Sequence, residues 1–393
     1  MKNHVLSFFL LLIFNQINAQ NLLEFNYDIT SKNINSTVVD SYGLYWIATK
    51  EGLNMFDGNK VHSFYSILSD KKSILNNSIS SIIELKNKNL VFISKDGLSI
   101  FNRKSFDFTR KKISYPISVL HDKNNQIYYV TTSQNGIYQL DENFKTINNF
   151  KTDPLNPFTV SSNNFSPENK QKTIKLLNEN GDFIVAADQV LNLFNSEKQN
   201  FTRFQFSDQK TKERINSISK FDNNRLIIGR NHGLEIFDTH KNSINEIDGF
   251  QNSKIHDLFV INTSIKTYNI SKSSEGNNDI VFYVFVLTDK SLYRLSFNDE
   301  LILISAKNLY DNSKLQMNKI SVTDKNFIIW NNNRDILIKY NFSGKKIEQL
   351  SSNFSVNNIC VDSDDNLVLS TINGLFLDIP DNSFIKTKKI IND

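Results

Sequence analysis

A degenerate repeat runs through the chain and constrains its fold more than any other feature. In its best copy, an apolar strand ending at Asp40 precedes a turn through Gly43, and two further strands surround a turn at Gly52. The turn glycine after the second strand recurs in later copies as Gly97, Gly136, Gly233 and Gly374. Self-similarity at a regular spacing is the signature of a repeat architecture.

Eight copies of the repeat can be traced once degenerate ones are included. The turn glycines are spaced roughly 40–50 residues apart or at multiples of that length, which is the range of common repeat units. Three weaker copies fill the long gaps, and their first strands cover 174–178, 255–260 and 320–323. The repeat therefore extends over nearly the whole chain.

The repeat predicts an all-β fold, namely a β-propeller of four-stranded blades. Each copy supplies short apolar strands separated by Gly, Asn and Asp turns, and no stretch has sustained helical spacing of apolar residues. Second strands such as 44–48 and 280–287 are apolar on both faces, as expected for a blade between two neighbouring blades. One ring of eight blades is the first prediction, and seven blades plus a leftover repeat is the alternative.

The best copy resembles the two-component regulator propeller repeat. That family has an I-x-S-I-x-x-D strand, a D-x-x-G turn, then L-W-I-G-T and G-L-x-x-F/Y-D. The matching residues are Ile34, Ser36, Val38, Asp40, Gly43, Trp46, Ile47, Thr49, Gly52, Leu53, Phe56 and Asp57. The copy departs at Ala48, where the family has Gly. The resemblance covers roughly 23–390, and the segment 22–27 resembles the strand that precedes the first blade in the family.

The resemblance implies a sensor. Such propellers form the extracytoplasmic half of hybrid two-component systems and related membrane regulators, where they commonly detect oligosaccharides released from glycans. By this resemblance we expect a ligand-sensing propeller for an oligosaccharide, with no signalling domain in this chain. It would act through a membrane-bound signalling partner or through self-association. A stand-alone propeller and a truncated sensor are both compatible with the sequence.

The first 19 residues have the features of a secretory signal peptide. Lys2 precedes a largely apolar run over 5–14, and Ala19 is the small residue expected before the cleavage site. This run is too short for a membrane helix, and no later run approaches the roughly 20 apolar residues that such a helix needs. We therefore expect a periplasmic or otherwise exported protein in which residues 20–393 form one propeller domain without a membrane span.

Composition and motifs point to no catalytic residue, metal or cofactor. The net charge of +4 is too weak to predict nucleic-acid binding. The single cysteine, Cys360, lies in an apolar strand pattern and is expected to be a small core residue. The histidines lack metal-ligand spacing, and no nucleophile elbow or phosphate loop is present. The segment 362–366 reads D-S-D-D-N, but the Gly and Glu of a calcium loop are missing, so we interpret it as a hairpin turn.

The repeat also indicates which end of a propeller would bind a ligand. If the I-x-S strand is innermost, the turns between second and third strands share one end with the connections leading into each blade. Amide and charged side chains on these turns suit the recognition of hydroxyl groups. The candidate ligand-binding residues are Lys50, Glu51, Lys95, Asn135, Arg230, His232, Arg334 and Asn373. Trp46 and Trp330 lie inside second strands and are expected in the core.

Two other classes of function stay open at this point. An extracytoplasmic interaction scaffold would have an exposed apolar patch in place of a defined pocket. A propeller lyase or hydrolase, which we favour less, would need acidic and basic residues converging in the channel. The polar segment 262–278 within the sixth copy is expected to be a variable surface loop.

Overall fold

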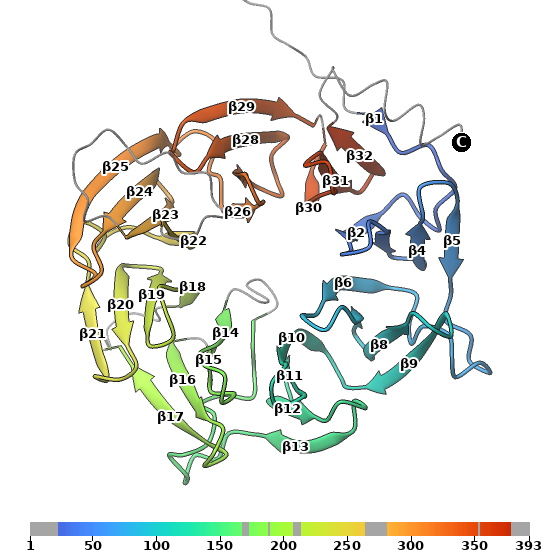
Figure 1. The fold of residues 1–393 in the computed structure, drawn as a ribbon, viewed down its shortest axis with the longest axis horizontal. Coiled ribbons are helices and arrows are strands. Elements are labelled where there is room, and N and C mark those ends of the chain that lie inside the picture. The colour runs from blue at the N-terminus through green and yellow to red at the C-terminus, as the bar shows by residue number, and fades with distance from the viewer. Residues whose placement is uncertain are drawn as a thin grey trace, which may run out of the picture.

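The computed structural model is a closed ring of eight four-stranded antiparallel sheets around a central channel (Figure 1). It describes residues 23–166, 173–187, 189–206, 214–263, 281–352 and 354–378, and in these ranges the elements are 32 β-strands without an α-helix. The prediction of an eight-bladed β-propeller is thereby confirmed, and the alternative of seven blades plus a leftover repeat is wrong. The signal peptide predicted over 1–19 and nearly all of the loop 262–278 lie outside the described residues.

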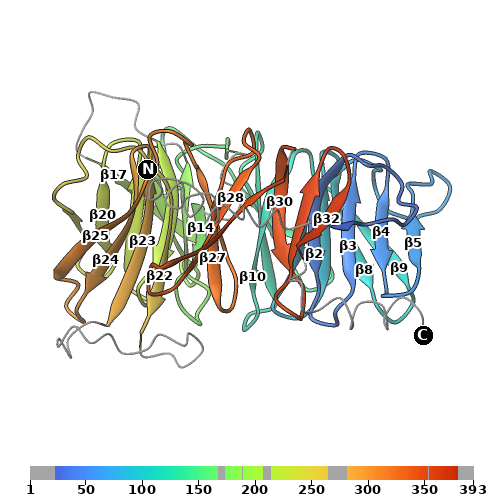
Figure 2. The same cartoon turned by 90° about the horizontal axis from the view of Figure 1, so that it is seen from above.

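In the first seven blades the strands follow one another from the channel outwards, and the strands run between the two flat faces of the disc (Figure 2). Blades 1 and 2 contain β2 (Ile34–Val39), β3 (Tyr45–Thr49), β4 (Leu53–Phe56) and β5 (Val61–Phe64), then β6 (Ile79–Glu84), β7 (Leu90–Ser94), β8 (Gly97–Asn102) and β9 (Asp107–Lys112). Blades 3 and 4 contain β10 (Pro116–Asp122), β11 (Ile127–Thr132), β12 (Ile137–Leu140) and β13 (Thr146–Phe150), then β14 (Ile174–Leu176), β15 (Phe183–Ala187), β16 (Val190–Asn195) and β17 (Asn200–Gln205).

The second half of the ring continues in the same order. Blades 5 and 6 contain β18 (Ile215–Lys220), β19 (Arg225–Arg230), β20 (Leu234–Asp238) and β21 (Ser243–Glu246), then β22 (Ile255–Asn262), β23 (Phe282–Thr288), β24 (Ser291–Phe297) and β25 (Leu303–Asp311). Blade 7 contains β26 (Lys319–Val322), β27 (Asn326–Trp330), β28 (Ile336–Asn341) and β29 (Lys346–Ser351). The three inner strands of blade 8 are β30 (Val356–Val361), β31 (Leu367–Thr371) and β32 (Leu375–Asp378).

The eighth blade joins the two ends of the described chain. Its outermost strand is β1 (Leu23–Glu24), which pairs antiparallel with β32 (Figure 1). Beyond this pairing, the backbone N–H of Phe25 donates to the carbonyl of Leu375 at 2.9 Å. The segment 22–27 that stood out in the sequence therefore contains the strand that closes the ring.

The hydrophobic core is divided into eight clusters, one at each junction between neighbouring blades. Trp46 of blade 1, for example, packs against Phe92 of blade 2 with their ring centroids 5.2 Å apart. Strand β7 is buried over its whole length because a neighbouring blade covers each of its faces. This explains why the second strands are apolar on both faces. The stability of the ring therefore depends on contacts between adjacent blades.

Asp40 shows why Asp and Trp occur together in the best copy of the repeat. Its buried carboxylate accepts hydrogen bonds from the backbone N–H groups of Tyr42 (2.9 Å) and Leu44 (3.0 Å), which form the following turn. It also accepts from the indole Nε1 of Trp46 and from the guanidinium of Arg103 in blade 2, both at 2.9 Å. One side chain thus holds a turn, a core indole and the neighbouring blade.

In blade 2 the turn after the second strand requires glycine for steric reasons, and this gives a testable prediction. Gly97 has φ +147°, and a Cβ there would lie 2.1 Å from the carbonyl oxygen of Lys111. Gly97→Ala is therefore expected to lower the free energy of unfolding by about 2–4 kcal/mol in urea titrations. Gly43→Ala is the control, expected to cost only about 1 kcal/mol, since Gly43 has φ +80° and no atom lies within 4 Å of an added Cβ. Equal losses in the two variants would contradict this account.

Candidate functional site

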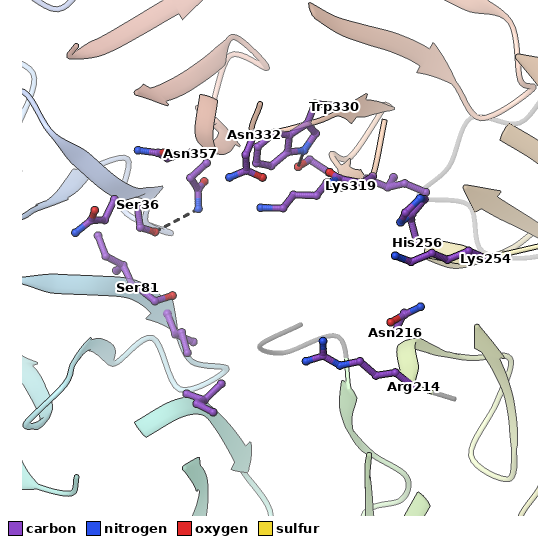
Figure 3. A pocket seen from close by; sticks show the side chains of 18 of the residues that line it. Ser36, Ser81, Arg214, Asn216, Lys254, His256, Lys319, Trp330, Asn332 and Asn357 are labelled. Atoms are coloured by element: carbon purple, nitrogen blue, oxygen red, sulfur yellow. Dashed lines mark hydrogen bonds between the residues drawn. The ribbon is translucent and has the colours of Figure 1, made fainter. Parts of the chain in front are cut away.

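A cavity of about 880 Å³ lies at the centre of the ring, at one end of the channel (Figure 3). Its twenty lining residues come from the innermost strands, the segments leading into them, and the ends of second strands with their turns. The amide and hydroxyl side chains are Asn35, Asn216, Asn231, Asn318, Asn332, Asn357, Asn358, Ser36, Ser81 and Ser321. We call this region the channel mouth.

A β-bulge at the start of the innermost strand shapes the channel mouth in most blades. In six blades the pairing with the second strand shifts between the first and third residues of the innermost strand. The bulged residues are Asn35, Ser80, Ile117, Asn216, His256 and Asn357. Five of these six line the cavity. A bulge changes the direction of a side chain, and here it occupies the x position of the I-x-S pattern.

Three of the bulged residues are asparagines that connect neighbouring blades. Each donates its side-chain N–H to the carbonyl of the first residue of the next innermost strand: Asn35 to Ile79 (2.7 Å), Asn216 to Ile255 (2.8 Å) and Asn357 to Ile34 (2.8 Å). The last of these bonds crosses the junction between blade 8 and blade 1. Because the ring itself holds these amides, the channel mouth is organised before any ligand arrives.

The charged side chains of the channel mouth all lie on blades 4 to 7. Lys175 belongs to blade 4, Arg214 and Lys254 lead into blades 5 and 6, and Lys319 belongs to blade 7. We call these four residues the cationic arc. Figure 3 shows Arg214, Lys254 and Lys319 extending from one side of the space, with neutral side chains across it. No Asp or Glu occurs among the twenty described residues that line the cavity.

Trp330 and His256 lie beside residues of the cationic arc. The ammonium group of Lys319 is 4.6 Å from the ring centroid of Trp330, and the indole Nε1 of Trp330 donates to the hydroxyl of Ser321 at 2.9 Å. His256 lies beside Lys254, and burial together with that lysine lowers the pKa of the imidazole below its usual 6.5. His256 is therefore mainly neutral at pH 7.

Both tryptophans are buried, as the sequence predicted, but their positions differ. Trp46 is fully buried at the junction of blades 1 and 2. Trp330 is buried at the junction of blades 7 and 8, and it also lines the channel mouth. The last residue of the second strand is Thr or Ser in five other blades, so Trp330 departs from the pattern at this position.

The turns between second and third strands do lie at the same end as the channel mouth. Backbone N–H groups of these turns donate to the segments that lead into the blades: Lys50 to Asn33 (3.3 Å), Asn231 to Arg214 (3.1 Å) and Asp289 to Lys254 (3.0 Å). Threonine hydroxyls stabilise several of the turns. Thr49, for example, donates to the carbonyl of Gly52 at 2.8 Å and accepts from the N–H of Glu51 at 3.0 Å.

The structure separates the eight candidate residues into two groups. Those on the turns at the channel end are Lys50, Glu51, Lys95, Asn135, His232, Arg334 and Asn373; Asn135 is half-buried and the others are exposed. Arg230 is buried at the end of β19, where its guanidinium bonds to the carboxylate of Glu235. None of the eight belongs to the lining of the cavity, so their role in ligand binding stays a prediction. The bulged x positions were missed because they follow no apolar pattern.

The segment 362–366 forms the turn between β30 and β31. The carboxylate of Asp362 accepts from the backbone N–H groups of Asp364 and Asn366 at 2.9 Å each, and from the hydroxyl of Tyr45 at 2.9 Å.

Cys360, on the strand before this turn, is partly buried at the junction of blades 8 and 1, and burial raises the pKa of its thiol to about 12. Across the described ranges, no group of three or more His, Cys, Asp or Glu side chains could hold a metal ion.

Comparison with known proteins gives matches at the level of the fold. No protein-family profile and no curated protein matches the sequence. Two structures of the extracellular domain of BT4673 from B. thetaiotaomicron match with TM-scores of 0.50 and 0.51 at 16% and 17% identity. One describes the protein as a hybrid two-component system and the other as a one-component system. They cover 91% and 92% of this chain, but the chain spans only about two fifths of their length (39% and 40%).

Two other propellers match over almost their entire length. The C-terminal WD40 domain of Sif2 has a TM-score of 0.60 at 9% identity, with 92% of this chain and 99% of that chain covered. BamB from Moraxella catarrhalis has a TM-score of 0.53 at 11% identity, with 91% and 95% covered. The chain is a β-propeller. It shares this fold with the extracellular domain of a two-component system, as the sequence resemblance predicted. In the part of the chain that the structure describes, no helix could cross a membrane.

Proposed function

We propose that this chain is an exported sensor propeller that binds an oligosaccharide at the channel mouth. The observation that carries the proposal is the cavity itself, which is lined by seven asparagines and three serines. Amides and hydroxyls both donate and accept hydrogen bonds, so they match the hydroxyl groups of a sugar. The cavity volume of about 880 Å³ lies within the range of small-molecule sites.

Three further arguments support a sensor over an enzyme. The first copy of the repeat resembles the propellers of two-component regulators, and the extracellular domain of BT4673 has the same fold. The leader predicted over 1–19 would export the chain to the periplasm, where released oligosaccharides occur. Among the described residues that line the channel mouth there is no carboxylate that would act as a general acid or base beside a bound sugar.

The proposed mechanism is a shift between two ways of packing. A ligand that spans the channel mouth contacts several blades at once, and each blade is otherwise held only by its neighbours. Binding would favour one arrangement of the ring against a membrane-bound signalling partner or a second copy of the chain. The exposed turns around the mouth, including Lys50, Lys95 and Asn373, would form the outer part of the ligand surface.

A thermal-shift screen against neutral and acidic oligosaccharides tests this proposal. A ligand that binds only the folded ring is expected to add about 2.7 kcal/mol of stability at a hundredfold excess over its Kd, and the melting temperature rises with its concentration. Asn332→Ala, in the lining of the cavity, should reduce the shift, whereas Asn148→Ala on the exposed strand β13 should leave it unchanged. A folded protein that responds to no oligosaccharide would favour the interaction scaffold.

A further inference from the structure

We propose that the ligand of the channel mouth is an acidic oligosaccharide, whose carboxylate or sulfate groups contact the cationic arc. This inference rests on the proposed function and specifies the chemical class of the ligand. The neutral half of the mouth, on blades 8, 1 and 2, would contact the sugar hydroxyls through residues such as Asn35, Ser81 and Asn358.

The first argument is the charge of the cavity. Four Lys or Arg side chains line it, and no Asp or Glu is found among its described lining residues. The whole chain contains 45 Lys and Arg against 41 Asp and Glu, so a random set of lining residues would on average contain nearly equal numbers of the two signs. A concave site lined by one sign of charge concentrates the potential and attracts ligands of the opposite sign.

The second argument is that the cations are confined to one side of the cavity. The cationic arc occupies blades 4 to 7, and the opposite blades present amides, hydroxyls and isoleucines (Figure 3). A simple polyanion would be matched by cations around the entire ring. A molecule with acidic groups on one side and hydroxyls on the other is matched by this arrangement, and acidic sugars have that character.

The third argument is that packing against an aromatic ring positions one of the cations beside the cavity. Lys319 lies against the face of Trp330 at 4.6 Å, which orients its ammonium group beside the cavity. His256 and Lys254 are neighbours, and burial and the lysine keep the imidazole from taking a proton easily. A carboxylate or sulfate bound beside His256 would favour the protonated imidazole.

Isothermal titration calorimetry with matched sugars tests the inference. The probes are a galacturonic acid trimer, the corresponding neutral galactose trimer and a sulfated disaccharide with its unsulfated form, each titrated into the protein at low and high salt. We expect each acidic probe that binds to bind at least tenfold more tightly than its neutral counterpart, with an advantage that shrinks as salt increases. Whether the carboxylated or the sulfated probe binds identifies the anionic group.

Charge-removal variants locate the effect. The double variant Lys254→Gln/Lys319→Gln should weaken acidic probes at least tenfold and leave neutral ones unchanged. Lys241→Gln is the control, because Lys241 lines a separate cavity of about 500 Å³ between blades 5 and 6. Salt dependence in the unaltered protein provides a second measure if the double variant does not fold.

The possible outcomes distinguish this inference from the proposed function. Equal binding of acidic and neutral members of a pair would overturn the inference and leave the oligosaccharide sensor intact. Equal weakening by Lys241→Gln and the double variant would also overturn it, because the attraction would then be diffuse. If no sugar binds, the proposed function fails and the inference fails with it.

Discussion

Phe25→Ala is expected to lower the free energy of unfolding by about 3–5 kcal/mol, the usual range for truncating a buried aromatic ring. Phe25 follows the closing strand β1 and is 8% exposed. Its ring lies 5.0 Å from that of Phe56 and 4.8 Å from that of Tyr27, between centroids. The residue thus packs in the core cluster of blades 8 and 1, the junction where opposite ends of the described chain meet.

The loss of unfolding free energy in Phe25→Ala should exceed the loss expected from the buried area of the ring alone. Other blades are joined by the chain itself, but blades 8 and 1 depend on β1, the cluster around Phe25 and a few hydrogen bonds such as Asn357 to Ile34. Urea unfolding of Phe25→Ala measures the effect, and Phe158→Ala, at a ring that is 60% exposed, is the control. A change below about 1 kcal/mol for Phe25→Ala would show that β1 contributes little to closure.

The second large effect is expected at the buried ion pair of blade 5. Arg230 is 5% exposed and Glu235 is 1% exposed; the guanidinium Nε donates to the carboxylate at 2.7 Å, and the guanidinium also lies over the ring of Phe206. Arg230→Met should destabilise the protein by about 3–5 kcal/mol, because the carboxylate stays buried after losing its cation. Chemical denaturation of the purified variant measures this loss.

A double variant separates the charge effect from the loss of packing. Arg230→Met/Glu235→Leu removes both charges and should recover most of the stability, since apolar residues of similar size often replace a buried pair without loss. Trimming the charge of an exposed pair, as in Lys32→Gln beside Glu24, should change stability by less than about 1 kcal/mol. A double variant as unstable as the single one would indicate that packing of the arginine stem, and not its charge, is decisive.

The number of blades was predictable because the apolar second strands survive where other parts of the repeat do not. Blade 4 has lost its turn glycine, yet Phe183–Ala187 is apolar throughout and buried as β15. Burial between two blades requires apolar residues on both faces of such a strand, and this requirement leaves a pattern that can be read without a structure. The closing strand was also recognisable, through the family resemblance, over 22–27.

The lining of the channel mouth was not predictable in the same way. Bulges change the direction of single side chains such as those of Asn216 and His256, and no periodic pattern in the sequence indicates a bulge. The cationic arc is assembled from residues of four blades, so its members are far apart in the sequence. Arg230 was predicted to bind ligand because it precedes a polar turn in the sequence. In the structure its side chain is buried inside the blade, where it pairs with the carboxylate of Glu235 on the next strand.

The most direct test of ligand binding at the channel mouth is a tryptophan fluorescence titration with the tightest-binding oligosaccharide. The chain has two tryptophans: Trp330 lines the mouth beneath Lys319, and Trp46 is fully buried between blades 1 and 2. We predict a saturable change in emission with the Kd measured by calorimetry, and its disappearance in Trp330→Phe while calorimetric binding persists. Calorimetric binding with no emission change, or an unaltered change in Trp330→Phe, would contradict binding at the channel mouth.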